Sequence, residues 1–221
     1  LLEWQWRDIV APLFGWKRAD GTRRYRRGYI EVPKKNGKSA LFSGLSLYLL
    51  IADGEPGAEV YSAAVDRDQA SIVFNEAANM VEASPALLTK LDVVRSTKRI
   101  VFKSSRSVYR ALSADVPAKE GLNAHAVLID ELHAQKNREL WDTHRYAGAS
   151  RRQPLNLAIT TAGYDRHSIC WEQHCYAEHV LTGVIEDSSF FAYIAAAAPE
   201  DDWADPKVWK KANPSFGITV N

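Results

Sequence analysis

At residues 32–39 the chain reads Val32-Pro33-Lys34-Lys35-Asn36-Gly37-Lys38-Ser39, and this stretch indicates the fold. An alternating run rich in β-formers precedes it, from Gly28 to Val32, and a long apolar run follows it, from Ala40 to Ile51. These runs predict a strand and a helix joined by a tight loop. The first N–H groups of such a helix lack helical partners and lie at the positive end of the helix dipole. The loop is therefore expected to bind phosphate.

The loop is similar to the Walker A pattern G-x-x-x-x-G-K-[ST], in which the lysine contacts the β- and γ-phosphates and the hydroxyl binds Mg²⁺. Lys38 and Ser39 occupy these two positions. The pattern also asks for a glycine five residues before Gly37, where this chain has Val32. On this segment alone, a surface turn with a solvated lysine is an equal alternative.

A second segment, Ala126 to Glu131, carries two carboxylates at the end of an apolar run that predicts a buried strand. This is a Walker B arrangement, in which one carboxylate holds hydrated Mg²⁺ and the other activates water. We assign Asp130 to the metal and Glu131 to the water. Helix capping is the alternative, but it explains one carboxylate more easily than two. The two motifs together predict a nucleoside triphosphatase.

A third apolar segment, Leu155 to Ile159, ends in Thr160 and Thr161. Ligands of a doubly wound sheet bind outside the carboxyl ends of the strands, so these hydroxyls are expected near the γ-phosphate or the attacking water. A strand-to-helix turn with a threonine cap is the alternative interpretation.

Composition and periodicity predict one α/β domain with a mostly parallel sheet, flanking helices and antiparallel additions. Hydrophobic residues make up 46% of the chain and charged residues 25%, as in an ordinary globular protein. Short strands at residues 92–94, 99–102 and 107–112 are expected to form an antiparallel extension and a core strand. Other expected elements are a strand at 59–65, a helix from the Asp66 cap to about Glu82, helices at 138–148 and 168–181, and a strand at 190–198.

Neither a membrane span nor a signal sequence is expected. No run approaches about 18 apolar residues, and the start of the chain lacks a basic segment. Two cysteines suit a reducing compartment. The same helix carries Cys170, His174, Cys175 and His179. These residues fall on two faces of one helix, so we do not expect them to close a tetrahedral zinc site.

Basic residues gather before the phosphate loop, at residues 17–18 and 23–27. They predict either a hairpin that touches a DNA backbone or a loop whose arginines pair with nearby acids. The net charge of +1 does not distinguish between these two interpretations, because phosphate binding depends on a local patch. Further upstream, the amide of Gln5 could donate to N7 and accept from N6 of adenine.

With these segments in hand, the chain resembles the ATPase half of the terminase large subunit, the DNA-packaging motor of tailed double-stranded DNA phages. The resemblance spans nearly the whole chain. The matching segments are Trp4-Gln5, Val32 to Ser39, Tyr61 to Ala70, Val127 to Ala134, Thr160 to Gly163, Trp209, and Ala212-Asn213-Pro214.

The resemblance implies a P-loop NTPase fold of RecA/ASCE type that uses ATP and Mg²⁺. It implies a catalytic Glu131, assisted by Lys38, and a Thr161 that senses the γ-phosphate. The expected nucleotide contacts are Gln5, Lys34, Lys35, Asn36, Gly37, Lys38, Ser39 and Thr160. The expected metal contacts are Ser39 and Asp130. The ATPase domain should cover residues 1–198, and residues 199–221 should lead toward a nuclease domain beyond this chain.

The resemblance also implies partners, namely double-stranded DNA, a portal protein, a small terminase subunit and neighbouring copies in a ring. The ring would form on the procapsid in the host cytoplasm, and a monomer in solution is left open. Two departures limit the likeness. The family often has arginine where this chain has Lys34, and its trans-acting arginine falls where this chain has Lys119 and Glu120. The arginine finger is therefore unassigned.

Two other interpretations remain open. A DExH helicase-like translocase would use Gln5, Lys38 and Glu131 equally well, but it needs a second RecA-like lobe. A non-catalytic nucleotide-dependent binding module would not require Glu131.

Overall fold

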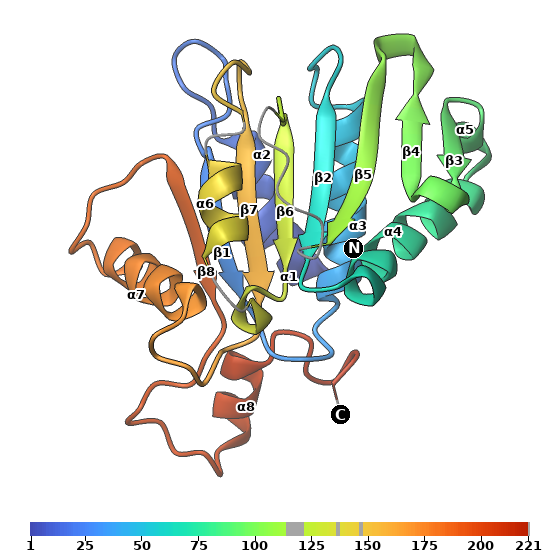
Figure 1. The fold of residues 1–221 in the computed structure, drawn as a ribbon. Coiled ribbons are helices and arrows are strands. Elements are labelled where there is room, and N and C mark those ends of the chain that lie inside the picture. The colour runs from blue at the N-terminus through green and yellow to red at the C-terminus, as the bar shows by residue number, and fades with distance from the viewer. Residues whose placement is uncertain (114–121, 136–137, 146–147, 221) are drawn as a thin grey trace.

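The computed structural model describes residues 1–113, 122–135, 138–145 and 148–220. Helices cover both faces of one sheet (Figure 1). The strands are β1 Arg27–Glu31, β2 Glu59–Ala64, β3 Leu91–Val94, β4 Arg99–Phe102, β5 Ser107–Ser113, β6 Ala126–Asp130, β7 Leu155–Thr160 and β8 Phe190–Ile194. The α-helices are α1 Glu3–Gln5, α2 Ala11–Gly15, α3 Lys38–Ile51, α4 Arg67–Glu82, α5 Pro85–Leu88, α6 Glu139–Arg145, α7 Ile169–Leu181 and α8 Pro206–Ala212. Short turns of other helix types are η1 Trp6–Val10, η2 Arg95–Thr97, η3 Lys103–Ser105 and η4 Leu132–Ala134.

The sheet has the strand order β3-β4-β5-β2-β6-β7-β1-β8. Every neighbouring pair from β5 to β8 is parallel, whereas β3 and β4 add to the β5 edge in antiparallel fashion. The predicted fold class, a mostly parallel sheet flanked by helices with antiparallel additions, is confirmed. The last strand is shorter than expected, because β8 loses its partner where β1 ends at Glu31.

Strand order brings the three predicted motifs together. Strand β7 lies between β6 and β1 and pairs with both in parallel. All three therefore end at the same edge, with Thr160 opposite Glu31 and Asp130 opposite Ile159. This edge carries the phosphate loop after β1, the two carboxylates at the end of β6 and the two threonines at the end of β7.

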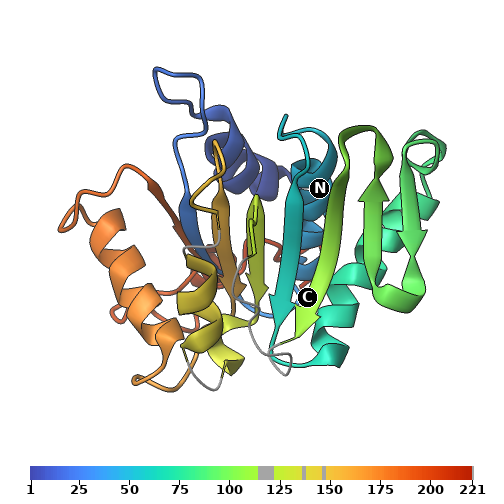
Figure 2. The same cartoon turned by 45° about the horizontal axis from the view of Figure 1, so that its top comes forward.

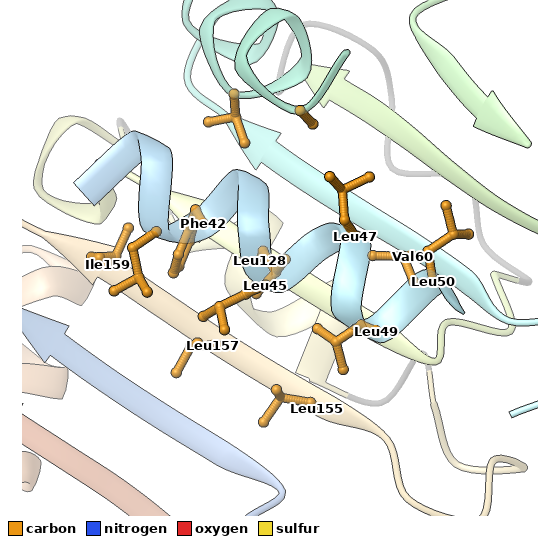
Figure 3. Close-up of a cluster of buried hydrophobic side chains, with 14 of the residues drawn as sticks. Phe42, Leu45, Leu47, Leu49, Leu50, Val60, Leu128, Leu155, Leu157 and Ile159 are labelled. Atoms are coloured by element: carbon orange, nitrogen blue, oxygen red, sulfur yellow. The ribbon is translucent and has the colours of Figure 1, made fainter. Parts of the chain in front are cut away.

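The hydrophobic core forms two layers, one on each face of the sheet. Figures 1 and 2 show α3 and α4 on one face and α6 and α7 on the other. Phe42 and Leu45 of α3 lie near Leu128, Leu157 and Ile159 of the central strands (Figure 3). Burial of these side chains anchors α3, whose first turn follows the phosphate loop.

The N-terminal helical stretch, residues 3–15, contains a π-helical turn, η1, between α1 and α2. Pro12 has no N–H and its ring crowds the carbonyl four residues earlier, which accounts for the irregular turn. The stretch places Trp4 and Gln5, both buried, beside the phosphate loop. Among the described residues no helix is long and apolar enough to cross a membrane.

Candidate functional site

The phosphate loop turns sharply into α3. Gly37 adopts φ +73°, and an added Cβ there would lie 3.0 Å from Nε2 of Gln5, so glycine suits this position. Lys35 also adopts a left-handed conformation, with φ +66°, which is strained for a residue with a side chain. Leu41 N donates to Gly37 O, so the preceding N–H groups of the first turn are available to a ligand.

Lys38 points its ammonium group into this loop. Its side chain is 7% exposed, and Nζ donates to the carbonyl oxygens of Val32 and Pro33 at 3.4 and 3.3 Å. Burial lowers the pKa of Lys38, although Glu131 opposes the shift. Nζ lies 3.9 Å from Oε1 of Glu131. The first and second predicted motifs therefore face each other.

The two carboxylates at the end of β6 occupy different environments. Asp130 is 5% exposed, and burial, followed by the charge of Glu131, raises its pKa to about 6. Glu131 adopts φ +51°, a conformation that is uncommon outside glycine and that gathers at functional sites. With Lys38 as the facing cation, the carboxylates leave an excess of negative charge. This edge is suited to a divalent cation.

His133 joins these carboxylates to the threonines at the end of β7. Its Nδ1 lies 3.1 Å from Oε2 of Glu131, 3.0 Å from Oγ1 of Thr160 and 3.3 Å from Oγ1 of Thr161. The contact with Glu131 is an ion-pair distance without hydrogen-bonding geometry, so Oε2 is a buried oxygen with no hydrogen-bond donor among the described residues. That unpaired oxygen is available to accept a proton.

The two threonines differ in the hydrogen bonds that their hydroxyls make within the chain. Oγ1 of Thr160 accepts from His133 N at 3.1 Å and donates to Thr161 O at 2.8 Å, and this side chain is fully buried. Thr161 is 8% exposed and its hydroxyl contacts Nδ1 of His133. Of the pair, Thr161 is the freer to meet a ligand.

The other predicted nucleotide contacts lie in the loop itself or, in the case of Gln5, next to it. Ser39 is half-buried, while Lys34 and Lys35 are exposed. Gln5 is 4% exposed, and its Nε2 donates to the carbonyl oxygens of Asn36 and Gly37 at 3.3 and 3.4 Å. Its amide therefore holds the backbone of the loop, and the sequence did not indicate this contact.

His133 is a site residue that the motif analysis did not assign. The only signal for it is the spacing Asp-Glu-x-His at the end of β6. Lys119 and Glu120, where the family's trans-acting arginine would fall, lie outside the described residues.

The basic stretch before β1 lies at the opposite edge of the sheet. Arg23 is fully buried and pairs with Asp53 at 2.8 Å, and Arg27 pairs with Asp187 at 2.9 Å. Arg24 donates to Ser188 O and Arg26 to Arg152 O. Of the two interpretations, these contacts favour arginines that pair within the chain.

Cys170 and His174 of α7 contact different residues of β1. Sγ of Cys170 lies 3.5 Å from Tyr29 OH, and Nδ1 of His174 lies 2.9 Å from Oε2 of Glu31. Burial raises the pKa of the Cys170 thiol, which makes it a poor metal ligand at neutral pH.

A parallel sheet with a Gly-Lys-Ser loop after β1 and paired carboxylates after the strand two places away defines a P-loop type nucleoside triphosphatase fold. The family model of the terminase large subunit ATPase domain matches residues 3–179. The chain therefore belongs to the terminase large subunit ATPase domain family, for which ATP hydrolysis and a motor role in phage DNA packaging are the general functions.

Two curated relatives are similar to parts of this chain. It is 36% identical to Protein YmfN of Escherichia coli K12 over 101 residues, which are 46% of this chain and 22% of that protein. It is 25% identical to the large terminase subunit of Enterobacteria phage HK97 over 191 residues, which are 85% of this chain and 37% of that protein. This chain thus spans well under half of these curated relatives.

Solved structures share the fold. The crystal structure of the HK97 large terminase superposes with a TM-score of 0.85 at 23% identity, covering all of this chain and 44% of that one. The large terminase ATPase domain of Thermus phage P74-26 superposes with a TM-score of 0.60 at 20% identity, covering 96% of each chain.

Proposed function

We propose that this chain binds ATP with Mg²⁺ at the carboxyl edge of β1, β7 and β6 and hydrolyses it with Glu131 as general base. The observation that carries the proposal is the approach of Lys38 Nζ to within 3.9 Å of Glu131 Oε1, with Asp130 beside them. A phosphate group on the lysine would then lie next to the base that activates water.

The residues fit the two ligands. The N–H groups of the first turn of α3 and the ammonium of Lys38 suit the β- and γ-phosphates. Ser39 and Asp130 would hold Mg²⁺, which supplies charge neutralisation of the phosphates when bound. Burial, followed by the charge of Glu131, raises the pKa of Asp130 to about 6, and a bound cation would favour the charged form of this carboxylate. Lys34, Lys35, Gly37 and the backbone of Asn36 would complete the cradle.

Glu131 would take a proton from the attacking water on its unpaired Oε2. Thr161 would contact the γ-phosphate or that water, and Thr160 would hold His133 in place beside it. His133, 3.1 Å from Glu131, would report a change at the carboxylate to β7. Gln5 would serve the adenine only if its amide leaves Asn36 and Gly37.

At the level of the whole protein, we propose a motor that drives double-stranded DNA into a procapsid with a portal protein and a small terminase subunit. Copies would form a ring in the host cytoplasm, with ATP held between neighbours. Residues 1–198 would form the ATPase domain and residues 199–221 a connection to a nuclease domain. Family membership and the shared fold with the HK97 large terminase support this proposal.

The test is ATP turnover of purified protein carrying Glu131→Gln or Lys38→Ala. Loss of a general base typically lowers turnover about 10²- to 10⁴-fold, and we expect a fall in this range for Glu131→Gln. Binding of a fluorescent ATP analogue should survive in Glu131→Gln and weaken in Lys38→Ala. Glu76→Gln and Lys90→Ala, which change exposed residues away from the loop, are the matched controls.

Unchanged turnover in both site variants would refute the site. ATP binding without turnover in the unaltered protein, even with DNA and partners added, would favour the non-catalytic binding module.

A further inference from the structure

The last described residues of the chain fold back onto the phosphate loop. Figure 1 shows the red C-terminal segment beside the blue loop that joins β1 to α3. Asn36 is fully buried, and its Oδ1 accepts from Ser215 N at 2.9 Å. Thr219 Oγ1 donates to Lys35 O at 2.6 Å. Two consecutive loop residues are therefore tied to residues 213–219, which we name the C-terminal clasp.

Both polar atoms of the Asn36 side chain take part in these contacts. Its Nδ2 lies within hydrogen-bonding distance of Pro33 O, Lys34 O and Asn213 Oδ1 at 3.3, 3.2 and 3.5 Å. The same side chain thus closes the loop upon itself and attaches it to the clasp. A side chain buried this completely has no remaining group to offer to a phosphate.

The clasp is itself anchored. Ser215 is fully buried, and its hydroxyl accepts from Nε1 of Trp4 at 3.1 Å. Trp4 in turn stacks on Tyr193 of β8. The next residue, Gln5, donates to the carbonyl oxygens of Asn36 and Gly37. The phosphate loop is therefore held from two sides, by the N-terminal helical stretch and by the clasp.

The composition of the loop explains the need for support. Lys35 occupies a left-handed conformation that favours glycine, and such strain persists only where surrounding contacts fix it. The clasp contacts fall on Lys35 and on the residue after it. A glycine could adopt this conformation without help, whereas this loop has Lys35 at that position.

We infer that Asn36, Ser215 and Thr219 are positioning residues that hold the glycine-poor phosphate loop in its ATP-binding shape. The inference rests on the proposed function of the loop. Binding free energies are reciprocal, so ATP on the loop should also hold the clasp in place. The clasp would then be a built-in part of the nucleotide site rather than a passive connection.

The first experiment measures ATP affinity and steady-state kinetics of Thr219→Val in the full 221-residue chain. Thr219 is exposed, so the change should not disturb folding. One neutral hydrogen bond is worth about 0.5–1.5 kcal/mol, so Kd and KM for ATP should rise about two- to tenfold with little change in kcat. Thr219→Ser should restore the affinity. Thr182→Val, which removes an exposed hydroxyl at the end of α7, is the matched control.

The second experiment follows hydrogen exchange of the Ser215 amide with and without a non-hydrolysable ATP analogue. Slower exchange with the analogue, and loss of that protection in Thr219→Val, are the expected results. The inference about the clasp would be refuted if Thr219→Val bound ATP as tightly as the unaltered chain, or if nucleotide did not change the exchange of the Ser215 amide. Either result would leave the proposed function intact. Failure of the unaltered chain to bind ATP would instead overturn the proposed function, and the clasp with it.

Discussion

Charged clusters lie at both ends of strands β1, β6 and β7, and the two clusters differ in how well their charges balance. At the amino ends, Arg23 pairs with Asp53 at 2.8 Å, and Nε2 of His125 lies 2.7 Å from the same carboxylate. The Arg23 and Asp53 side chains are 0% and 2% exposed. Gln153 donates to Asp53 O and accepts from Arg23 N. The charges of Arg23 and Asp53 balance there, although Nδ1 of His125 is buried without a hydrogen-bond partner among the described residues.

At the carboxyl ends of these strands the positive and negative charges do not balance. Two carboxylates face Lys38, the pKa of Asp130 is raised to about 6, and Oε2 of Glu131 is buried without a hydrogen-bond donor among the described residues. Glu131 also has a strained backbone. A charge-balanced cluster, here called the closed cluster, therefore lies at one end of these strands, and a cluster with excess negative charge, the incomplete cluster, lies at the other. An incomplete polar cluster lowers stability and is expected where a ligand completes it.

The largest effect on stability should come from breaking the closed cluster. Asp53→Asn leaves the Arg23 charge buried without a counter-charge, and we expect the unfolding free energy to fall by about 3–5 kcal/mol at pH 7. Urea denaturation followed by circular dichroism measures it. Asp92→Asn, which breaks an exposed pair with Lys103, is the control and should cost about 1 kcal/mol or less.

The effect of Asp53→Asn should also depend on pH. Burial alone would raise the pKa of Asp53, but the bonds from His125 and Arg23 outweigh it and hold the pKa below its usual value. A lowered folded pKa contributes stability above the unfolded pKa of about 4, and this is lost as pH falls below that value. The difference from the unaltered protein should therefore shrink in acid, and a constant difference would refute this assignment.

The opposite sign is expected at the incomplete cluster. Asp130→Asn removes a carboxylate whose folded pKa lies above its unfolded value, so the penalty it relieves is fully present above pH 6 and absent below about pH 4. We expect the variant to gain about 1–3 kcal/mol at pH 8 without Mg²⁺ or nucleotide, and to lose ATP turnover. Calorimetry at pH 8 and pH 4 checks the gain, which should vanish at the lower pH. Lower stability at pH 8 would mean that the carboxylate is already satisfied.

The smallest effect on stability should come from Thr160, whose hydroxyl supports the fold, whereas the neighbouring Thr161 is proposed to contact a ligand. Thr160→Val leaves the N–H of His133 without its hydroxyl acceptor and should cost about 1 kcal/mol. Thr160→Ser should be close to neutral, and Thr182→Val is the exposed control. Equal melting temperatures for Thr160→Val and the unaltered protein would show that this hydroxyl is not needed by the fold.

Local chemistry made much of the fold predictable. The Asp66 cap is confirmed, since its Oδ1 accepts from the N–H groups of Asp68 and Gln69. The antiparallel extension with its neighbouring core strand, and the buried strand before Asp130, were also predicted, because alternation and apolar runs are properties of short segments. The expected helix at 168–181 begins one residue later, at Ile169.

The parts that sequence reasoning missed are set by contacts between distant segments. Nothing near Arg23 in the sequence indicates that it is buried against Asp53 and His125. Its neighbours left open either a DNA-binding hairpin or a loop whose arginines pair with nearby acids. The clasp on Asn36 joins residues 179 positions apart. The roles of Lys38, Glu131 and Thr161 stay predictions, although the geometry brings their side chains to one edge.

Strand order also sets when the site can form during synthesis. Both neighbours of β1 are late strands, since β7 and β8 begin 128 and 163 residues after β1 does. Until residues 155–160 have left the ribosome, the strand that carries the phosphate loop has no partner in the sheet. Such long-range pairing slows folding. A nascent chain should therefore be unable to bind ATP until most of the domain has been made, which keeps half-made copies out of any assembly that selects for bound nucleotide.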